Sequence, residues 1–532
     1  MNNKLTNRGS SRKFLVVGIF LGSSVAACGN ASLQVETVSV DGAPFEAPTT
    51  ISDVMPLRPI PTKTIGAYAV ANHLTCGASN IPGTIGDVAG FLAGKPSDFR
   101  TNFSLSNDAV HAEDWHRTSD LFAATTPTRQ GGADSSLITY IASHGGTSGG
   151  IFTASMGNTR YGGCGADSSN MGLGDGKTRY LFASTCESVK IGSGEDPYIP
   201  GSVPSLTWGS AARGLRCIYG YSSVSLDSDA YGTLFWNKLP GATSLTSAFF
   251  DASWDIYTDQ VPAALCYGSS RDAARRELDA TSFDTAAASG SFWGVWRWRN
   301  REPVVSTTRL PTRELRPSQV EALPGSALPE SAVAVARASL PSAHSRKSEG
   351  LAQHLWFSND DAVRHATNFL NQWGLNVPAA ELTPESVRVE AESDPSGQIL
   401  VREKTVIFRQ HVASVPILDG QYQLRLTLDA SGRVVDLYDG TVRVAVRALA
   451  PTGGPPRQPG ADEEDTIERS LLSLAQKRIG PNSTELRLKS VEMGFRIGVR
   501  TPGKRVEAAY HGVVSARSGQ FQRLYPVQLA AQ

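Results

Sequence analysis

Two stretches decide the fold of this chain: LITYIASHGG at residues 137–146 and YLFASTCE at residues 180–187. Each is an apolar run of strand length that ends in polar residues. The other strand-like runs are Ile65–Ala71, Leu215–Tyr219, Ala263–Cys266 and Phe292–Trp298, and helical spacing occurs at Ala230–Leu239 and Leu245–Tyr257. Strands that alternate with helices predict an α/β domain with a mostly parallel sheet flanked by helices on both faces.

The polar ends of these two runs carry residue types suited to nucleophilic catalysis. In parallel sheets, functional groups gather outside the carboxyl ends of neighbouring strands, so His144 and Cys186 are expected to face each other. A thiolate is the nucleophile in such a pair, and the imidazole donates a proton to the leaving amine. The N–H groups of Gly145 and Cys186 would hold the oxyanion. The structural alternative is a strand-end histidine and a disulfide-bonded Cys186.

An apolar run with His-Gly, followed by an apolar run with Cys, resembles the caspase-like (clan CD) cysteine peptidases over Thr64–Arg299. The resemblance implies a protein or peptide substrate, with His144 as general acid, Gly145 as oxyanion donor and Cys186 as nucleophile. The segment Trp208–Phe235 is also similar to a poorly characterised bacterial family of this fold. Thr185 departs from the small residue usual before the nucleophile. An inert caspase-like scaffold that binds a partner is the alternative function.

The remaining cysteines bear on this site. The chain has six, and besides Cys28 they are Cys76, Cys164, Cys186, Cys217 and Cys266. An odd number in an oxidising compartment leaves at least one thiol over. If two disulfides form among the other four, Cys186 is unpaired, but three pairings of those four are possible. Five buried free thiols are the alternative.

The N-terminus predicts export. Basic residues precede the apolar run Phe14–Leu21, which is too short to cross a bilayer, and small residues lead to Cys28. The residues Val25–Cys28 resemble the lipobox of bacterial lipoproteins, which implies cleavage of a signal peptide at 1–27 and a lipid anchor on Cys28. Gly29 then points to the outer membrane or cell surface, with the mature chain extracytoplasmic. An ordinary secretory signal is the alternative.

The rest of the chain divides by composition. We expect a tether at 28–62, the caspase-like domain at 63–300, a Pro/Ser/Ala-rich linker at 301–350, and α+β units at 351–450 and 461–532. A helix capped by Ser358 and closed by Gly374 precedes several strands. A second helix, Glu463–Lys477, precedes strands at 486–493, 495–499, 506–514 and 521–529. This repetition predicts a duplicated unit.

The stretch FRQHVASVPI at 408–417, with the run at 424–437, resembles PepSY-like and thermolysin-propeptide-like modules over 357–446. In those families the module inhibits or chaperones a peptidase. The resemblance therefore implies one or two PepSY-like units that mask the active site until the linker is cut.

The charge balance and the candidate metal ligands add little to the prediction of function. Lys and Arg together number 50, as do Asp and Glu, so bulk charge argues against a nucleic-acid partner and leaves the lipid anchor as the expected membrane contact. No cofactor or metal site is expected. Asp167, Asn170 and Asp175 offer oxygen ligands for Ca²⁺, but their spacing fits no known calcium loop, and a solvated glycine-rich loop is the better interpretation.

Overall fold

The computed structural model describes residues 63–117, 131–159, 163–193, 197–198, 201–288, 293–303, 320–323, 328, 330–341, 350–375, 381–412, 415–418, 422–446, 461–481, 485–496, 507–519 and 521–530. The expected signal peptide at 1–27, the acylated Cys28 and the tether at 28–62 lie outside these residues. The chain divides into Met1–Ile60 and Pro61–Gln532, and only the second unit is described. Within the described ranges, no helix has the length and apolarity needed to cross a membrane.

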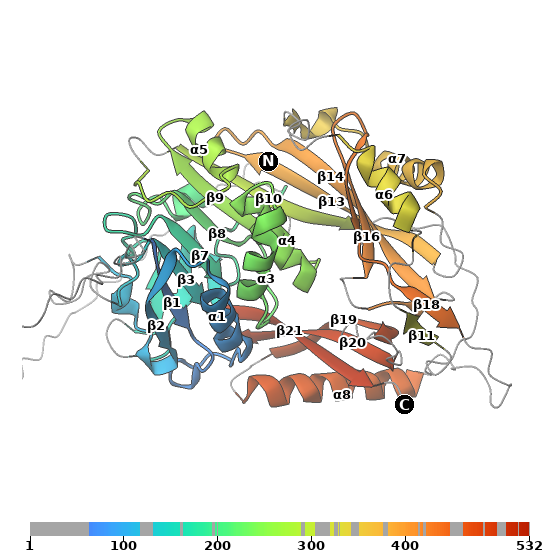
Figure 1. Cartoon of the computed structure of the whole chain (residues 1–532). Helices are drawn as coiled ribbons and strands as arrows, with labels where there is room; N and C mark the ends of the chain where they lie inside the picture. The colour runs from blue at the N-terminus through green and yellow to red at the C-terminus, as the bar shows by residue number, and fades with distance from the viewer. Residues whose placement is uncertain are drawn as a thin grey trace, which may run out of the picture. The chain divides into compact units, whose positions relative to one another are not determined.

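The first part of the main sheet is mostly parallel, as predicted. Its strands are β1 (Lys63–Ala69), β2 (Phe99–Ser106), β3 (Ile138–Ala142), β7 (Tyr180–Ser184), β8 (Cys217–Tyr221), β9 (Pro262–Gly268) and β10 (Trp293–Pro303). The order is β2-β1-β3-β7-β8-β9-β10, and the pairs from β2 to β8 are parallel. Strands β9 and β10 are antiparallel to their neighbours (Figure 1).

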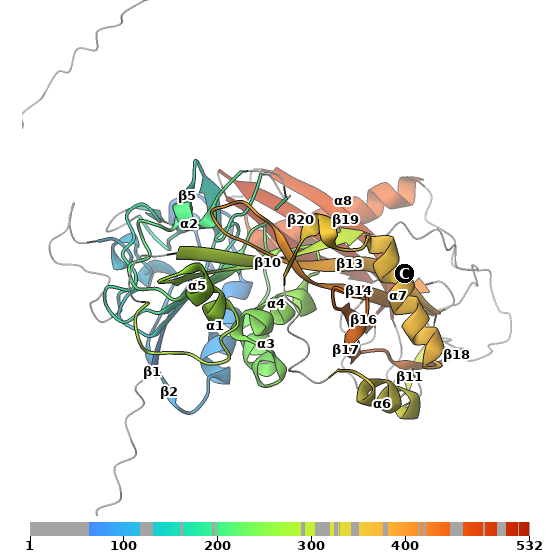
Figure 2. The ribbon, with the colours of Figure 1, turned by 90° about the horizontal axis from the view of Figure 1, so that it is seen from above.

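Alternation along each strand divides the core into two layers. In β7, Tyr180 and Phe182 pack on one face, and Leu181 and Ala183 on the other. The first face is covered by α1 (Gly83–Gly94), α3 (Tyr231–Lys238), α4 (Leu245–Ile256) and α5 (Arg271–Leu278) (Figure 2). Short 3-10 helices lie at Leu74–Cys76, Asn107–Ala109, Ala112–Asp114, Leu239–Gly241 and Gln353–Leu355.

The second face corrects the expectation of helices on both sides. The α-helix that the described residues place on this face is the single turn α2 (Pro204–Thr207), followed by the buried Trp208. The rest of the cover includes a small antiparallel sheet of β4 (Gly145–Ser148), β5 (Ile151–Ser155) and β6 (Gly165–Asp167). The segment after His144 forms this sheet because it returns as a hairpin instead of entering a helix.

The main sheet continues into the C-terminal half. Strand β10 pairs antiparallel with β13 (Glu381–Ser393), followed by β14 (Leu400–Val412), β16 (Gln423–Leu428) and β17 (Val434–Asp439). Strands β12 (Leu351–Ala352) and β15 (Val415–Pro416) also pair with β14, giving thirteen strands. At the β10–β13 seam, buried Arg299 binds Glu390 at 2.7 Å. The domains expected at 63–300 and 351–450 therefore share one sheet.

The expected linker at 301–350 contains regular elements. Strand β10 runs to Pro303, β11 (Val320–Leu323) pairs with β18 (Arg443–Val446), and α6 spans Glu330–Ala338. Helix α6 packs its buried Val333 and Ala336 into the core that it shares with α7 (Asn359–Gln372). An apolar stripe at helical spacing within a Pro/Ser/Ala-rich stretch was missed, because composition masked its period.

The C-terminal helices follow the sequence prediction closely. The Ser358 hydroxyl accepts the Asp361 N–H at 3.1 Å, and Gly374 adopts φ +63° after α7. Helix α8 (Ala461–Ile479) precedes an antiparallel sheet of β19 (Glu485–Arg496), β20 (Glu507–Ser518) and β21 (Phe521–Ala530). The prediction of two strands at 486–499 is wrong, because 485–496 is one strand with a register shift after Leu488.

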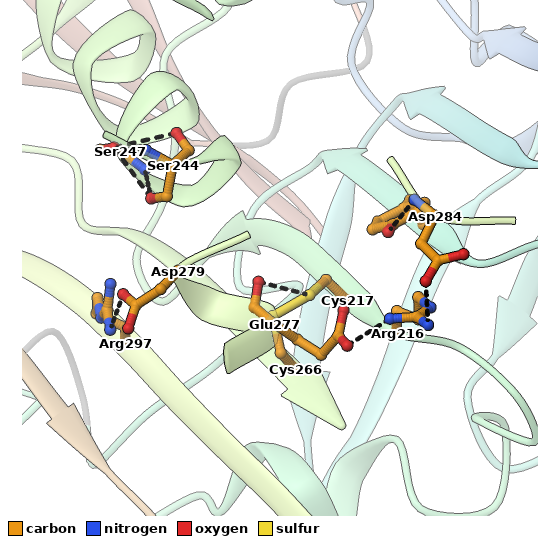
Figure 3. The surroundings of a disulfide bond; sticks show 10 residues. Arg216, Cys217, Ser244, Ser247, Cys266, Glu277, Asp279, Asp284 and Arg297 are labelled. Atoms are coloured by element: carbon orange, nitrogen blue, oxygen red, sulfur yellow. Dashed lines mark hydrogen bonds and ion pairs between the residues drawn. A yellow bond between two sulfur atoms is a disulfide. The ribbon is translucent and has the colours of Figure 1, made fainter. Parts of the chain in front are cut away.

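The structure also decides the cysteine pairing. Cys217 and Cys266 face each other on neighbouring strands β8 and β9 and form one disulfide (Figure 3). Cys76 and Cys164 form the second across 88 positions of sequence. Cys186 is a buried free thiol. Two disulfides with Cys186 left over were expected, but not which partners join.

Candidate active site

The two motif-bearing strands lie side by side. Strands β3 and β7 are parallel, and Ala142 pairs with Ser184 at their ends. His144 and Cys186 each follow two residues beyond that pair, so both turns leave the same rim of the sheet. A Cβ on Gly145 would lie 2.7 Å from the Cys186 carbonyl oxygen. Glycine is therefore required here so that the two turns can pack against each other.

The turn after Cys186 is held in an unusual conformation. Glu187 has φ +53°, in the left-handed region that non-glycine residues rarely adopt. Thr147, three residues after His144, donates its N–H to the Glu187 carboxylate at 3.1 Å and its hydroxyl to the Glu187 carbonyl at 2.7 Å. Lys190 forms an ion pair with the same carboxylate. The histidine-bearing segment thus fixes the shape of the cysteine-bearing turn.

His144 is completely buried and is neutral. Its Nε2 lies 2.7 Å from the Ser79 carbonyl oxygen, which requires a proton on Nε2, and its Nδ1 has no hydrogen-bond partner in the part of the chain that the structure describes. Burial lowers the pKa of His144 well below 6.5, and the neighbouring His73, with ring centroids 4.8 Å apart, lowers it further. In this arrangement the imidazole is neutral, and its one ring proton, on Nε2, is held by the Ser79 carbonyl.

Cys186 is buried beside a second loop. Its sulfur accepts the Ser225 N–H at 3.3 Å, and Val513 and Leu524 of the C-terminal sheet pack around it. Within the described ranges, no hydrogen bond joins Cys186 to His144. The elements that carry the two residues are adjacent, but their side chains are engaged elsewhere.

Strand β21 covers both residues, and sequence reasoning missed its role. Phe521 stacks on the His144 ring with centroids 5.8 Å apart. Arg523 Nη1 lies 3.8 Å from Cys186 Sγ, and the Tyr525 hydroxyl donates to the Asn80 carbonyl at 2.9 Å. These three residues alternate along the strand and so share one side of it. The available signal in the sequence was Arg523, which stands between two aromatic residues, Phe521 and Tyr525, at every second position of the strand.

The weak calcium candidates are not gathered into a site. The Asp167 carboxylate accepts the Thr153 hydroxyl, and Asp175 pairs with Arg213 at 3.6 Å. Among the residues that the structure describes, no group of three or more His, Cys, Asp or Glu side chains is placed to hold a metal ion. The absence of a cofactor stays a prediction.

The comparison with protein families gives a match over the first part of the described chain. A family model described as "Domain of unknown function (DUF6345)" matches residues 64–297. This span includes both strand ends, the Ser225 loop and both disulfides, but not β21. No curated protein matches the chain.

Proposed function

We propose that this chain is an exported cysteine endopeptidase of the caspase-like type, anchored by lipid at Cys28 and held latent by its C-terminal region. One observation carries the proposal. Of the five cysteines after Cys28, four form disulfides, and the free one, Cys186, follows a strand whose parallel neighbour leads to His144. A cysteine nucleophile requires a free thiol and an imidazole within reach of it.

In the proposed reaction the Cys186 thiolate attacks the carbonyl carbon of a peptide bond, and the carbonyl electron pair moves to oxygen. The Gly145 and Cys186 N–H groups hold that oxyanion. As the C–N bond breaks, His144 gives its proton to the leaving amine. Water then attacks the thioester, its proton passes to His144, and the thiolate and a carboxylic acid product are released.

Latency follows from the burial of His144. The general acid in this reaction is the protonated imidazolium, and burial lowers the pKa of His144 far below neutral pH, so the buried ring stays neutral. Exposure of the ring to water would bring its pKa back toward 6.5. Removal of β21, whose Phe521 stacks on His144, would therefore both open the site and restore the acid.

The covering unit begins with α8, so the effective cut lies after β18 and not in the stretch first expected. A break between Val446 and Ala461 separates α8 and β19–β21 from the rest of the chain. A break at 304–319 leaves β21 covalently joined to β13–β18. The PepSY-like resemblance of 357–446 then describes the part that stays paired with β10.

The test uses the full chain with a specific protease site inserted between Val446 and Ala461. A thiol-directed peptidyl probe should label the nicked protein at Cys186 and should not label the intact protein. Cys186→Ala should abolish labelling, turnover and self-cleavage, and His144→Ala should abolish turnover. Turnover that persists in Cys186→Ala would remove the proposal.

An inert scaffold that binds a protein partner is the second candidate. It is favoured by the lack of a Cys186–His144 hydrogen bond among the described residues and by the Ser79 contact that occupies His144. Under this alternative, the nicked chain stays unlabelled at Cys186, while the surface that β21 covered still binds a partner strand.

A further inference from the structure

Arg388 is a buried cation at the place where β10, β13 and β14 pair. It lies on β13, opposite Arg301 of β10 and Thr405 of β14, and only 3% of its surface is exposed. Its guanidinium carbon lies 4.0 Å from the centroid of the Trp254 ring of α4. The indole therefore covers one flat face of the guanidinium, and the N–H groups in the plane of that group have to find acceptors elsewhere.

One edge of the Arg388 guanidinium has no acceptor. Nε and Nη2 are both buried, and neither makes a hydrogen bond within the part of the chain that the structure describes. These two nitrogens lie on the same edge of the planar group, so their N–H groups can reach two oxygens of one carboxylate or phosphate at once. Buried donors in folded proteins are nearly always satisfied, which makes an unpartnered pair on one edge informative.

Arginines that share this face of the sheet form ion pairs with carboxylates. The pairs are Arg297–Asp279, Arg299–Glu390, Arg301–Glu385, Arg409–Glu385 and Arg425–Asp255. Across the described ranges Arg388 forms no ion pair, and the residue opposite it on β10 is the cation Arg301. Arg388 is therefore the member of this group whose charge is left without a carboxylate.

The surroundings of Arg388 do not compensate its charge. Burial lowers the pKa of Arg388 well below its usual value, and the neighbouring cations Arg425 and Arg299 lower it further. Asp255 acts in the opposite direction, but its carboxylate already lies 3.0 Å from Arg425 Nη2. Asp251 also opposes the shift, but it is paired with Arg299. Because a guanidinium keeps its proton in a protein, an added negative charge is what relieves this burial.

Hydroxyl groups lie beside Arg388 on the same face of the sheet. Ser386 precedes it by two residues on β13 and so points to the same side. Ser386 is fully buried, and its Oγ has no hydrogen-bond partner among the described residues. Thr405, directly opposite Arg388, has its hydroxyl 3.0 Å from that of Thr427 on β16. Uncharged donors next to one cation suit an anion, since each hydroxyl can donate to an oxygen.

We propose that Arg388 is the centre of an oxyanion-binding site, in which Nε and Nη2 bind two oxygens of a carboxylate or phosphate group and the Ser386 hydroxyl donates to one of them. Such groups fit because their oxygens match the spacing of the guanidinium edge, whereas chloride offers a single contact. The acids Asp251 and Asp255 disfavour a ligand that carries several negative charges. This site goes beyond the proposed peptidase function and does not depend on it.

The experiment measures binding of inorganic phosphate and of acetate to the full chain by isothermal titration calorimetry, with chloride added to keep the ionic strength constant. Arg388→Met removes the guanidinium, and Arg388→Lys keeps the charge without the planar edge. We expect saturable binding of at least one anion, weakened about 10- to 100-fold by Arg388→Met and about tenfold by Arg388→Lys. The matched control is Arg364→Met on α7, where an exposed arginine pairs with Asp361, and it should bind as wild type does.

The choice of anion identifies the ligand class. Binding of phosphate without acetate, or the reverse, supports the site and names the group that it takes. Absence of saturable binding of either anion to wild type would overturn the site, as would binding that Arg388→Met leaves unchanged. If Arg388→Met fails to fold, thermal unfolding decides with Arg388→Lys: the bound anion should raise the midpoint of wild type by about 1–3 °C more than that of the variant. Equal shifts would overturn the site.

Discussion

Arg523 Nη1 lies 3.8 Å from Cys186 Sγ, although 337 positions separate the two residues in the sequence. The contact joins the last strand of the chain to the only free thiol among the described cysteines. It also excludes water from that thiol, together with Val513 and Leu524. Cys186 is therefore shielded from solvent by residues of the C-terminal sheet.

The first prediction concerns the ion pair that fastens α8. Arg478 Nη2 lies 3.1 Å from the buried Asp227 carboxylate. Arg478→Ala should lower the free energy of unfolding by about 1–2 kcal/mol, because Asp227 loses a partner while remaining buried. It should also speed labelling of Cys186 in the intact chain. The matched control is Arg469→Ala on the same helix, whose bonds stay within α8. An equal effect of both variants would refute the fastening role.

The second prediction concerns the packing of the two turns. Gly145→Ala places a methyl group 2.7 Å from the Cys186 carbonyl and 2.8 Å from Thr185 Cβ. We expect a loss of about 1–3 kcal/mol in chemical denaturation, with lower turnover in the nicked protein. Gly241→Ala, with nothing within 4 Å of its new Cβ, is the control and should change stability by less than about 0.5 kcal/mol. A neutral Gly145→Ala would contradict the close approach.

The third prediction concerns pH. Burial lowers the pKa of His73 to about 4, below its usual 6.5, so protons bind the unfolded chain more readily. The contribution of the neutral, buried His73 ring to the free energy of unfolding is fully present above pH 6.5. It decreases by about 3 kcal/mol as the pH falls toward 4. His73→Gln should lose less stability than wild type between those pH values, although the buried His144 still contributes a loss of the same sign. The variant is compared with wild type at each pH because Asp87 titrates in the same range. Burial raises the pKa of Asp87 to about 6, so this group makes the folded chain more stable as the pH falls. Parallel curves would refute the assignment.

The fourth prediction separates the two disulfides. Cys76–Cys164 ties down the loop that carries Ser79, whereas Cys217–Cys266 joins two strands within the sheet. Replacing either pair with serine should cost about 2–4 kcal/mol. Only the loss of Cys76–Cys164 should also increase thiol labelling of Cys186 in the folded chain. Labelling measured below the unfolding transition distinguishes the two, and equal rates would show that the Ser79 loop does not guard the site.

The sequence predicted the two strand ends better than their surroundings. Apolar strand runs and the polar residues after them fixed which strands end in His144 and Cys186, because strand length and alternation are local properties. The caps at Ser358 and Gly374 were predictable for the same reason. The sharing of one sheet by β10 and β13 was not predictable, since strand pairing depends on register over long separations and not on composition.

By itself, the sequence determined that an imidazole and a thiol follow two strands of one α/β sheet, and that an odd cysteine remains when two disulfides form. Only the tertiary structure decided which cysteines pair, that His144 is buried against Ser79, and that Arg523 reaches Cys186. The physical reason is that burial and charge compensation arise from residues far apart in the chain. The role of the cation in the last described strand depends on the acceptors that the fold places around it.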